Sequence, residues 1–114
     1  MNSEIQIKET LKFSTNWNNK LNCNACTSIR LKNDTKFIIG AYYQFELKGE
    51  NSGVWQLVAK KDFQLAFLDE FSAMLDTGYG AQQTANIIKL MYKDKVDVGK
   101  AWFTKLLFVR KQDA

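Results

Sequence analysis

The sequence has no histidine and no proline among its 114 residues, and only two cysteines. Without an imidazole, the chain lacks the side chain on which most hydrolase triads and many metal sites depend. Two cysteines supply only half of the four ligands of a structural zinc ion, so a zinc site would have to be shared across a dimer. We therefore expect no metal ion and no cofactor.

Long apolar runs are absent as well. No window approaches the roughly 20 apolar residues of a membrane span, and the N-terminal MNSEIQIKET lacks the basic-then-apolar order of a signal peptide. We expect a cytoplasmic protein that does not contact a membrane. With 46% hydrophobic and 25% charged residues, the composition predicts a single folded domain over residues 1–114. The net charge of +4 is compatible with a polyanionic partner.

The two cysteines form a Cys-x-x-Cys pair, Cys23 and Cys26. Such a pair acts as a redox disulfide when its first thiol lies at a helix N-terminus, where the helix dipole lowers the pKa of the thiol. The residues that follow, TSIRL at 27–31, instead have the alternation of a strand. We interpret the cysteines as two small, partly buried residues of a loop.

The first two thirds of the chain contain patterns typical of strands. Strands are predicted in the second half of residues 7–14, at 27–31, within 41–49 and at 54–65. In the third of these, Tyr43, Phe45 and Leu47 should point to one face of a half-buried strand and Tyr42, Gln44 and Glu46 to the other. The glycine-bounded turn 49–53 joins the last two as a hairpin. Residues 16–22, which contain four asparagines, favour a turn or a single helical turn.

Apolar residues then recur at spacings of three and four, as on a helix. The first predicted helix ends before the glycines of 76–80, and its apolar face consists of Phe67, Leu68, Phe71, Met74 and Leu75. The second, at 81–93, has on one face Ala81, Ala85, Ile88, Met91 and Tyr92. Residues 102–109 predict a closing strand in the centre of a sheet. This order indicates an α+β fold, a small, mixed, mainly antiparallel β-barrel with two to three helices packed beside it.

Five short motifs, taken in order, resemble the ASCH domain family of the PUA-like superfamily. They are LKF at 11–13, TSIRL at 27–31, a glycine at 40 before AYYQFEL, IIKLMY at 87–92, and AWFTKLLFV at 101–109. The resemblance implies a PUA-like pseudobarrel with a cleft between barrel and helices that holds RNA or a modified nucleoside.

One branch of that family, small bacterial amidohydrolases acting on N4-acetylcytidine, uses a lysine, a threonine two residues before the arginine, and a glutamate. By this resemblance Ser28 takes the place of the threonine and Arg30 is the arginine. Ala25 stands where the lysine would be, and Asp76 or Thr77 where the glutamate would be.

Strand alternation places Ser28 and Arg30 on one face of TSIRL, with Thr27, Ile29 and Leu31 on the other, core-facing side. A guanidinium presents a planar fork of donors suited to a phosphate or a base edge. The alternative is an arginine paired with a carboxylate on the barrel surface. Ser28 could attack an acyl group only if a base took its proton.

A lysine could serve as that base, and the lysines nearest in sequence are Lys20 and Lys36. Trp17 and Tyr79 are the aromatics that core periodicity explains least, so both could stack on a base. Lysines at 60, 61, 100 and 105 could form a basic rim. The candidate ligand contacts are Trp17, Lys20, Thr27, Ser28, Arg30 and Tyr79.

Three functions remain open on these residues. The first is binding of RNA or a modified nucleoside in a cleft that contains Ser28 and Arg30. The second is an amidohydrolase for acylated cytidine-type nucleosides, with Ser28 and Asp76 as catalytic residues. The third is a protein-interaction module without a small ligand.

Overall fold

The computed structural model describes residues 5–113. The elements follow the order β1 (Ile7–Phe13), the 3-10 helix η1 (Trp17–Asn22), β2 (Ala25–Leu31), β3 (Tyr42–Leu47), β4 (Glu50–Gln64), the 3-10 helix η2 (Leu65–Phe67), α1 (Glu70–Thr77), α2 (Ala81–Tyr92) and β5 (Trp102–Gln112). This is the mixed α+β order predicted from the sequence. None of the helices in this part of the chain is long and apolar enough to cross a membrane.

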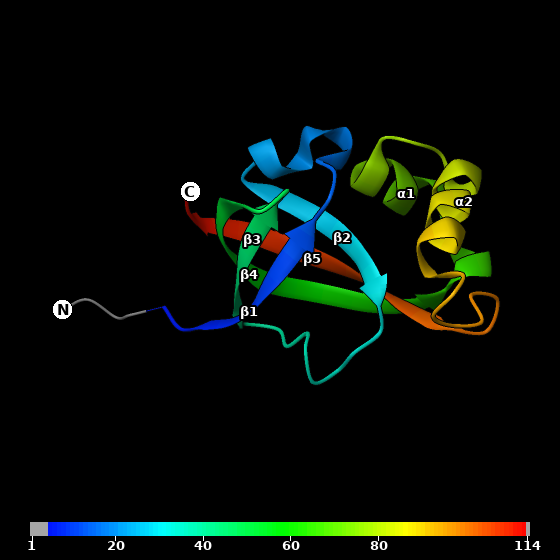
Figure 1. The fold of residues 1–114 in the computed structure, drawn as a ribbon, viewed down its shortest axis with the longest axis horizontal. Helices are drawn as coiled ribbons and strands as arrows, with labels where there is room; N and C mark the ends of the chain where they lie inside the picture. Colours follow the sequence, from blue (N-terminus) through cyan, green and yellow to red (C-terminus); the bar gives the residue numbers. More distant parts are fainter. Residues whose placement is uncertain (1–4, 114) are drawn as a thin grey trace.

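The five strands form one sheet in the order β1-β3-β4-β5-β2. Three strand pairs are antiparallel and one, β1 with β3, is parallel. β5 lies between β4 and β2, in agreement with its predicted interior place. The sheet curls, and α1 and α2 lie together beside β2 at one end of it (Figure 1).

The predicted closure into a barrel is not observed. Within residues 5–113, no strand pairing joins the two edge strands, β1 and β2. A side chain spans the seam instead: Arg30 on β2 donates a hydrogen bond to the backbone carbonyl of Lys12 on β1. The sheet is therefore curled and open, and the seam between its two edge strands is lined by side chains.

Aromatic side chains fill the inside of the curl. Tyr43, Phe45, Trp55 and Phe108 each have no exposed surface, and the rings of Phe45 and Trp55 stack with centroids 4.8 Å apart. Rings packed in this way contribute both buried apolar area and favourable ring contacts. The inward alternation expected for Tyr43 and Phe45 is thus present.

A second, smaller core lies between the outer face of the sheet and α2. It is built on Phe63, Phe103 and Ile88, and Ala85 and Tyr92 of α2 pack against it. The predicted inner face of α2 is therefore correct except at Met91, whose side chain is 54% exposed.

The predicted inner face of the first helix is wrong except at Leu68, which precedes α1, is partly buried and packs against the second core. Phe67 lies in η2 and is 75% exposed, and within α1 the exposed fractions are 77% for Phe71 and 51% for both Met74 and Leu75. The helix buries the polar residues Asp76 and Thr77 together with Ala73. Burial of these polar groups is tolerated because each has a partner, as described below.

The N-terminus of α1 is fixed to the sheet through Asp69. Its carboxylate accepts hydrogen bonds from the backbone N–H and the hydroxyl of Ser72 and faces the Lys105 ammonium at 3.3 Å. The bond from the Ser72 N–H is the main cause that lowers the pKa of Asp69 to about 2. Asp69 is therefore a charged N-cap at neutral pH, and it orients the helix that carries Asp76.

Gly53 gives a direct test of the packing between β4 and β5. Its φ is +99°, and a Cβ at this position would lie 2.6 Å from the backbone oxygen of Gln112. Gly49 has a similar φ of +85° with nothing within 4 Å. We expect Gly53→Ala to destabilise the fold by roughly 3 to 5 kcal/mol, since it adds a backbone clash to the conformational strain.

Gly49→Ala is the matched control and should cost only the strain of a left-handed backbone, about 1 to 2 kcal/mol. Urea denaturation followed by circular dichroism measures both. Equal losses for the two variants would contradict the close packing at Gly53.

Candidate functional site

Ser28 and Arg30 lie side by side on one face of β2. The Arg30 Nε donates a hydrogen bond to Ser28 Oγ at 3.0 Å, and its Nη2 donates to the Lys12 carbonyl at 3.0 Å. The guanidinium also stacks over the Phe13 ring, 4.6 Å from the ring centre. Arg30 takes part in none of the ion pairs found among residues 5–113, which argues against the surface ion pair considered above.

The other face of β2 is less buried than expected. Ile29 and Leu31 are partly buried and pack against the second core, whereas Ser28 is only 2% exposed. The sequence predicted that Ile29 and Leu31 would be buried in the core and that Ser28 would face a surface or cleft. The structure instead buries Ser28 more completely than the two apolar residues. Because helices cover only part of the outer sheet face, Ile29 and Leu31 on that face stay partly exposed.

The seam between β1 and β2 opens into a cleft that α1 and α2 wall on the far side. Its walls include Phe13 of β1, Trp17 and Lys20 of η1, Ser28 and Arg30 of β2, Asp76 of α1, and Met91 and Tyr92 of α2. The inner hollow is small, about 90 Å³. It has room for one edge of a planar group, while the bulk of a nucleoside would lie in the open mouth.

A buried ion pair forms one wall of this cleft. The Lys20 Nζ lies 2.7 Å from Asp76 Oδ1, and the side chains are only 6% and 9% exposed. The Thr27 hydroxyl donates to the same carboxylate oxygen at 3.3 Å. Asp76, which is 56 residues from Lys20 and 49 from Thr27 in the sequence, is thus brought into contact with both, and Ser28 lines the same cleft.

The lysine that lines the cleft is Lys20, and no lysine stands at the Ala25 position. Ala25 itself is exposed. The chain turns toward the cleft because Asn18 and Asn19 both adopt left-handed backbone angles, with φ of 56° and 53°. Asparagine tolerates this conformation better than most residues with a side chain, so the asparagine-rich segment was the available sequence signal.

Asn18 also holds this segment against α1. Its side-chain amide donates to the carbonyl of Met74 near the C-terminus of the helix, and its side chain lies against Gly78. Figure 1 shows the η1 segment next to α1. This contact holds η1 next to α1, in the position from which Lys20 reaches Asp76.

The Arg30 guanidinium has spare hydrogen-bonding capacity. A guanidinium carries five N–H donors, and only two of the hydrogen bonds among the described residues come from it. Burial is the largest effect on the pKa of Arg30 and lowers it, although Tyr92 and Asp76 oppose the shift. A partly desolvated cation without a carboxylate partner favours an acceptor-rich ligand.

Trp17 lines the cleft, and Tyr79 packs against Trp17 without lining the cleft itself. Their ring centres are 6.1 Å apart with an edge-to-face angle of 71°, and Tyr79 is 44% exposed. The loop that carries Tyr79 is tied down, because its N–H donates to the Thr77 hydroxyl, which in turn bonds to the Thr84 hydroxyl. The two aromatics singled out in the sequence therefore form one pair.

The loop expected for both cysteines is found only at Cys23, because Cys26 lies in β2. Cys23 is exposed and Cys26 is buried, and both are free thiols. Burial raises the pKa of Cys26 to about 12, so its thiolate is absent at neutral pH. Residues 5–113 also contain no group of three His, Cys, Asp or Glu side chains that could hold a metal ion.

Sequence reasoning missed the contributions of β1 and α2 to the cleft. The Lys12 carbonyl, Met91 and Tyr92 face it. No local pattern identifies these groups, because they reach the cleft only through the packing of distant elements.

No protein-family model matches the chain, and no curated protein matches it. Among solved structures, the fold is similar to the crystal structure of protein EF3133 from Enterococcus faecalis V583, a DUF984 protein, with a TM-score of 0.67. The match covers 97% of this chain and 84% of that chain at 8% sequence identity. At this identity the likeness shows a common fold and nothing of the ligand.

The buried pair predicts a strong energetic coupling. Lys20→Met and Asp76→Leu should each cost about 3 to 5 kcal/mol, because each leaves one buried charge without its partner. The double variant should cost well under the sum, since both charges are then gone. Chemical denaturation of the four proteins gives the coupling energy.

Asp34→Asn serves as the control, because Asp34 pairs with Lys32 at an exposed site, where its side chain is 62% exposed. It should change stability by less than about 1 kcal/mol. Additive losses for Lys20→Met and Asp76→Leu would show that the pair is not an energetic unit.

Proposed function

We propose that the seam cleft binds a modified nucleoside, free or within RNA, through the base. The observation that carries the proposal is the Arg30 guanidinium, which lines the cleft with unused donors and no carboxylate partner. Acceptors on a base edge suit such a planar fork. The resemblance to ASCH domains supports the same ligand class.

The size of the cleft and the aromatic pair beside it support this choice. A hollow of about 90 Å³ admits a base edge or a small base modification, and excludes a whole nucleoside from its interior. Trp17 lines the cleft and packs edge-to-face against Tyr79, so this pair offers ring faces and edges near the cleft on which a base could stack. The sugar and any phosphates then lie outside, toward solvent.

Arg30→Ala should weaken binding of a cytidine-type nucleoside by about 10- to 100-fold, since a hydrogen bond to a charged donor contributes about 1.5 to 3 kcal/mol. Isothermal titration with cytidine, N4-acetylcytidine and a single-stranded RNA 8-mer measures this loss. Affinity for the 8-mer should fall as salt rises, and affinity for the uncharged nucleosides should not.

Lys111→Ala, which alters an exposed lysine of β5 outside the cleft, is the control for general charge effects. Unchanged affinity in Arg30→Ala, or no binding of any of the three ligands, would refute the proposal.

A second function is favoured by a specific observation, the presence of Lys20 and Asp76 in the same cleft as the Ser28 hydroxyl. An amide hydrolase needs a hydroxyl nucleophile, a group that accepts its proton, and a group that holds the acceptor in place. Here Ser28 is the nucleophile, Lys20 accepts its proton, and Asp76 holds Lys20 in place. The Arg30 guanidinium donates a hydrogen bond to the Ser28 oxygen.

In that reaction Ser28 Oγ attacks the acyl carbon while its proton passes to an uncharged Lys20 amine. The C–N bond then breaks, and the proton goes to the departing exocyclic nitrogen. Water hydrolyses the acyl-serine, so that amide and water yield an amine and a carboxylic acid. For the first step Lys20 must turn from its ion pair with Asp76 toward the Ser28 hydroxyl.

This reaction predicts acetate release from N4-acetylcytidine with turnover. Ser28→Ala and Lys20→Met should each reduce the rate by at least about 100-fold, in line with the usual contribution of general base catalysis. Thr27→Val is the matched control, since Thr27 also touches Asp76 but faces away from Arg30. Binding without acetate release by the wild-type protein would exclude the hydrolase and leave the binding proposal intact.

A further inference from the structure

The outward face of α1 forms an apolar surface that the cleft does not use. It consists of Phe71, Met74 and Leu75, together with Phe67 just before the helix, each at least half exposed. Phe71, Met74 and Leu75 recur at the spacing of one helix face, and of these three Leu75 also lines the groove described next. Contiguous apolar patches of this kind on a protein surface usually mark a site of interaction with a partner.

Next to this stripe, the uncovered part of the sheet forms the floor of a groove. The groove lies between Leu75 and Ser72 on α1 and Thr27, Ala59 and Leu107 on the outer sheet face, and it has a volume of about 270 Å³. Its walls are predominantly apolar. It lies on the opposite face of β2 from Ser28, so it is separate from the seam cleft.

The charges at the rim of the groove are all of one sign. Lys60, Lys61 and Lys105 line it, and no carboxylate of the described residues does. The Lys60 amine donates to the Phe37 carbonyl and pairs with Asp34, so Lys61 and Lys105 are the lysines that face a partner in the groove. Lys105 also bonds to Ser72 and faces Asp69, which ties α1 to the sheet. Lys61 forms none of the ion pairs found within residues 5–113 and is exposed.

We propose that this groove, formed by α1 and the outer faces of β2, β4 and β5, binds an amphipathic helix of a partner protein that carries acidic residues beside its apolar face. The apolar floor takes side chains spaced at i, i+3, i+4 and i+7, as in other helix-in-groove contacts. The lysine rim pairs with acidic residues along the edge of that helix, which sets its orientation.

The shape of the surface favours a helix over other occupants. A membrane surface meets convex, protruding residues, whereas this site is a trough between a helix and a sheet. A second copy of this chain would bring the same lysines against lysines at a two-fold contact. An acidic helix satisfies both the shape and the charge.

Three 18-residue peptides of equal length test the proposal by fluorescence anisotropy with the full chain. The first places leucine on one helix face and glutamate elsewhere, the second replaces glutamate by lysine, and the third scrambles the first so that it has no apolar face. The first should bind at least tenfold more tightly than the other two, and raised salt should weaken it.

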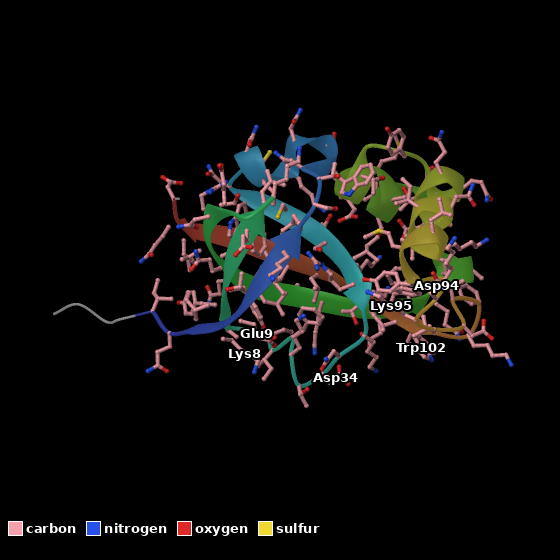
Figure 2. All side chains as sticks on the ribbon, in the orientation of Figure 1. Lys8, Glu9, Asp34, Asp94, Lys95 and Trp102 are labelled. Atoms are coloured by element: carbon pink, nitrogen blue, oxygen red, sulfur yellow. The ribbon has the colours of Figure 1, made fainter. Side chains whose placement is uncertain are left out.

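Variants on the groove supply the second half of the test. Leu75→Glu should weaken binding of the acidic peptide at least tenfold, and Lys61→Glu should weaken it while strengthening binding of the basic peptide. Lys8→Glu makes the same charge change on β1, at the far end of the molecule from α1 and α2 (Figure 2), and should leave both affinities unchanged. Leu75 and Lys61 are exposed, so the variants should fold, as a melting curve can show.

Several results would overturn the proposal. These are equal binding of the three peptides, no binding of any, or binding of the acidic peptide that Leu75→Glu and Lys61→Glu do not alter. If the protein sediments with anionic phospholipid vesicles and Leu75→Glu abolishes this binding, the surface would be assigned to a membrane instead. A dimer in analytical ultracentrifugation that the same variant dissociates would assign it to a second copy.

Discussion

The contact between Lys20 and Asp76 determines how the helical part of this protein meets the sheet. Two opposite charges at 2.7 Å, each almost fully buried, must be brought together, since either one alone would be strongly unfavourable in that environment. The pair therefore fixes the rotation of α1 about its axis. With Asp76 and Thr77 turned inward, the stripe that contains Phe71, Met74 and Leu75 has to face outward.

The gap between the edge strands β1 and β2 likewise depends on a polar side chain. In a closed barrel the backbone groups of β1 and β2 would pair, and no cleft would remain between them. Here the Arg30 side chain makes the connection, with one hydrogen bond to the Lys12 carbonyl and one to Ser28. A side-chain bridge holds the edges near each other and leaves polar groups at the seam accessible to a ligand.

The parts of the structure that depend on local periodicity could be predicted from the sequence. Alternation identified the inward aromatics Tyr43 and Phe45 and put Ser28 and Arg30 on a common face. The three-four spacing located both helices. Periodicity shows that a helix has an apolar stripe, however, and not that the stripe is buried, so the inner face of α1 was assigned wrongly.

The parts that depend on contacts between distant segments could not be predicted in this way. Lys20 and Asp76 are 56 residues apart, and the lysine reaches the carboxylate only because Asn18 and Asn19 turn the backbone. Whether β1 and β2 pair is likewise decided by the curvature of the whole sheet. Spacing relative to Ser28 was therefore an unreliable guide to which lysine enters the cleft, because the amine arrives from another element.

The two surfaces proposed for this protein share one short helix. Leu75 lines the groove on the outer sheet face and Asp76, the next residue, lines the cleft. The eight residues of α1 are tied at one end through Asp69 to Lys105 and at the other through Asn18. A rigid helix of this length cannot move one of these side chains without the other. Any partner that displaced α1 from the sheet would therefore shift Asp76 relative to Lys20 and Ser28, and would change the chemistry of the cleft without touching it.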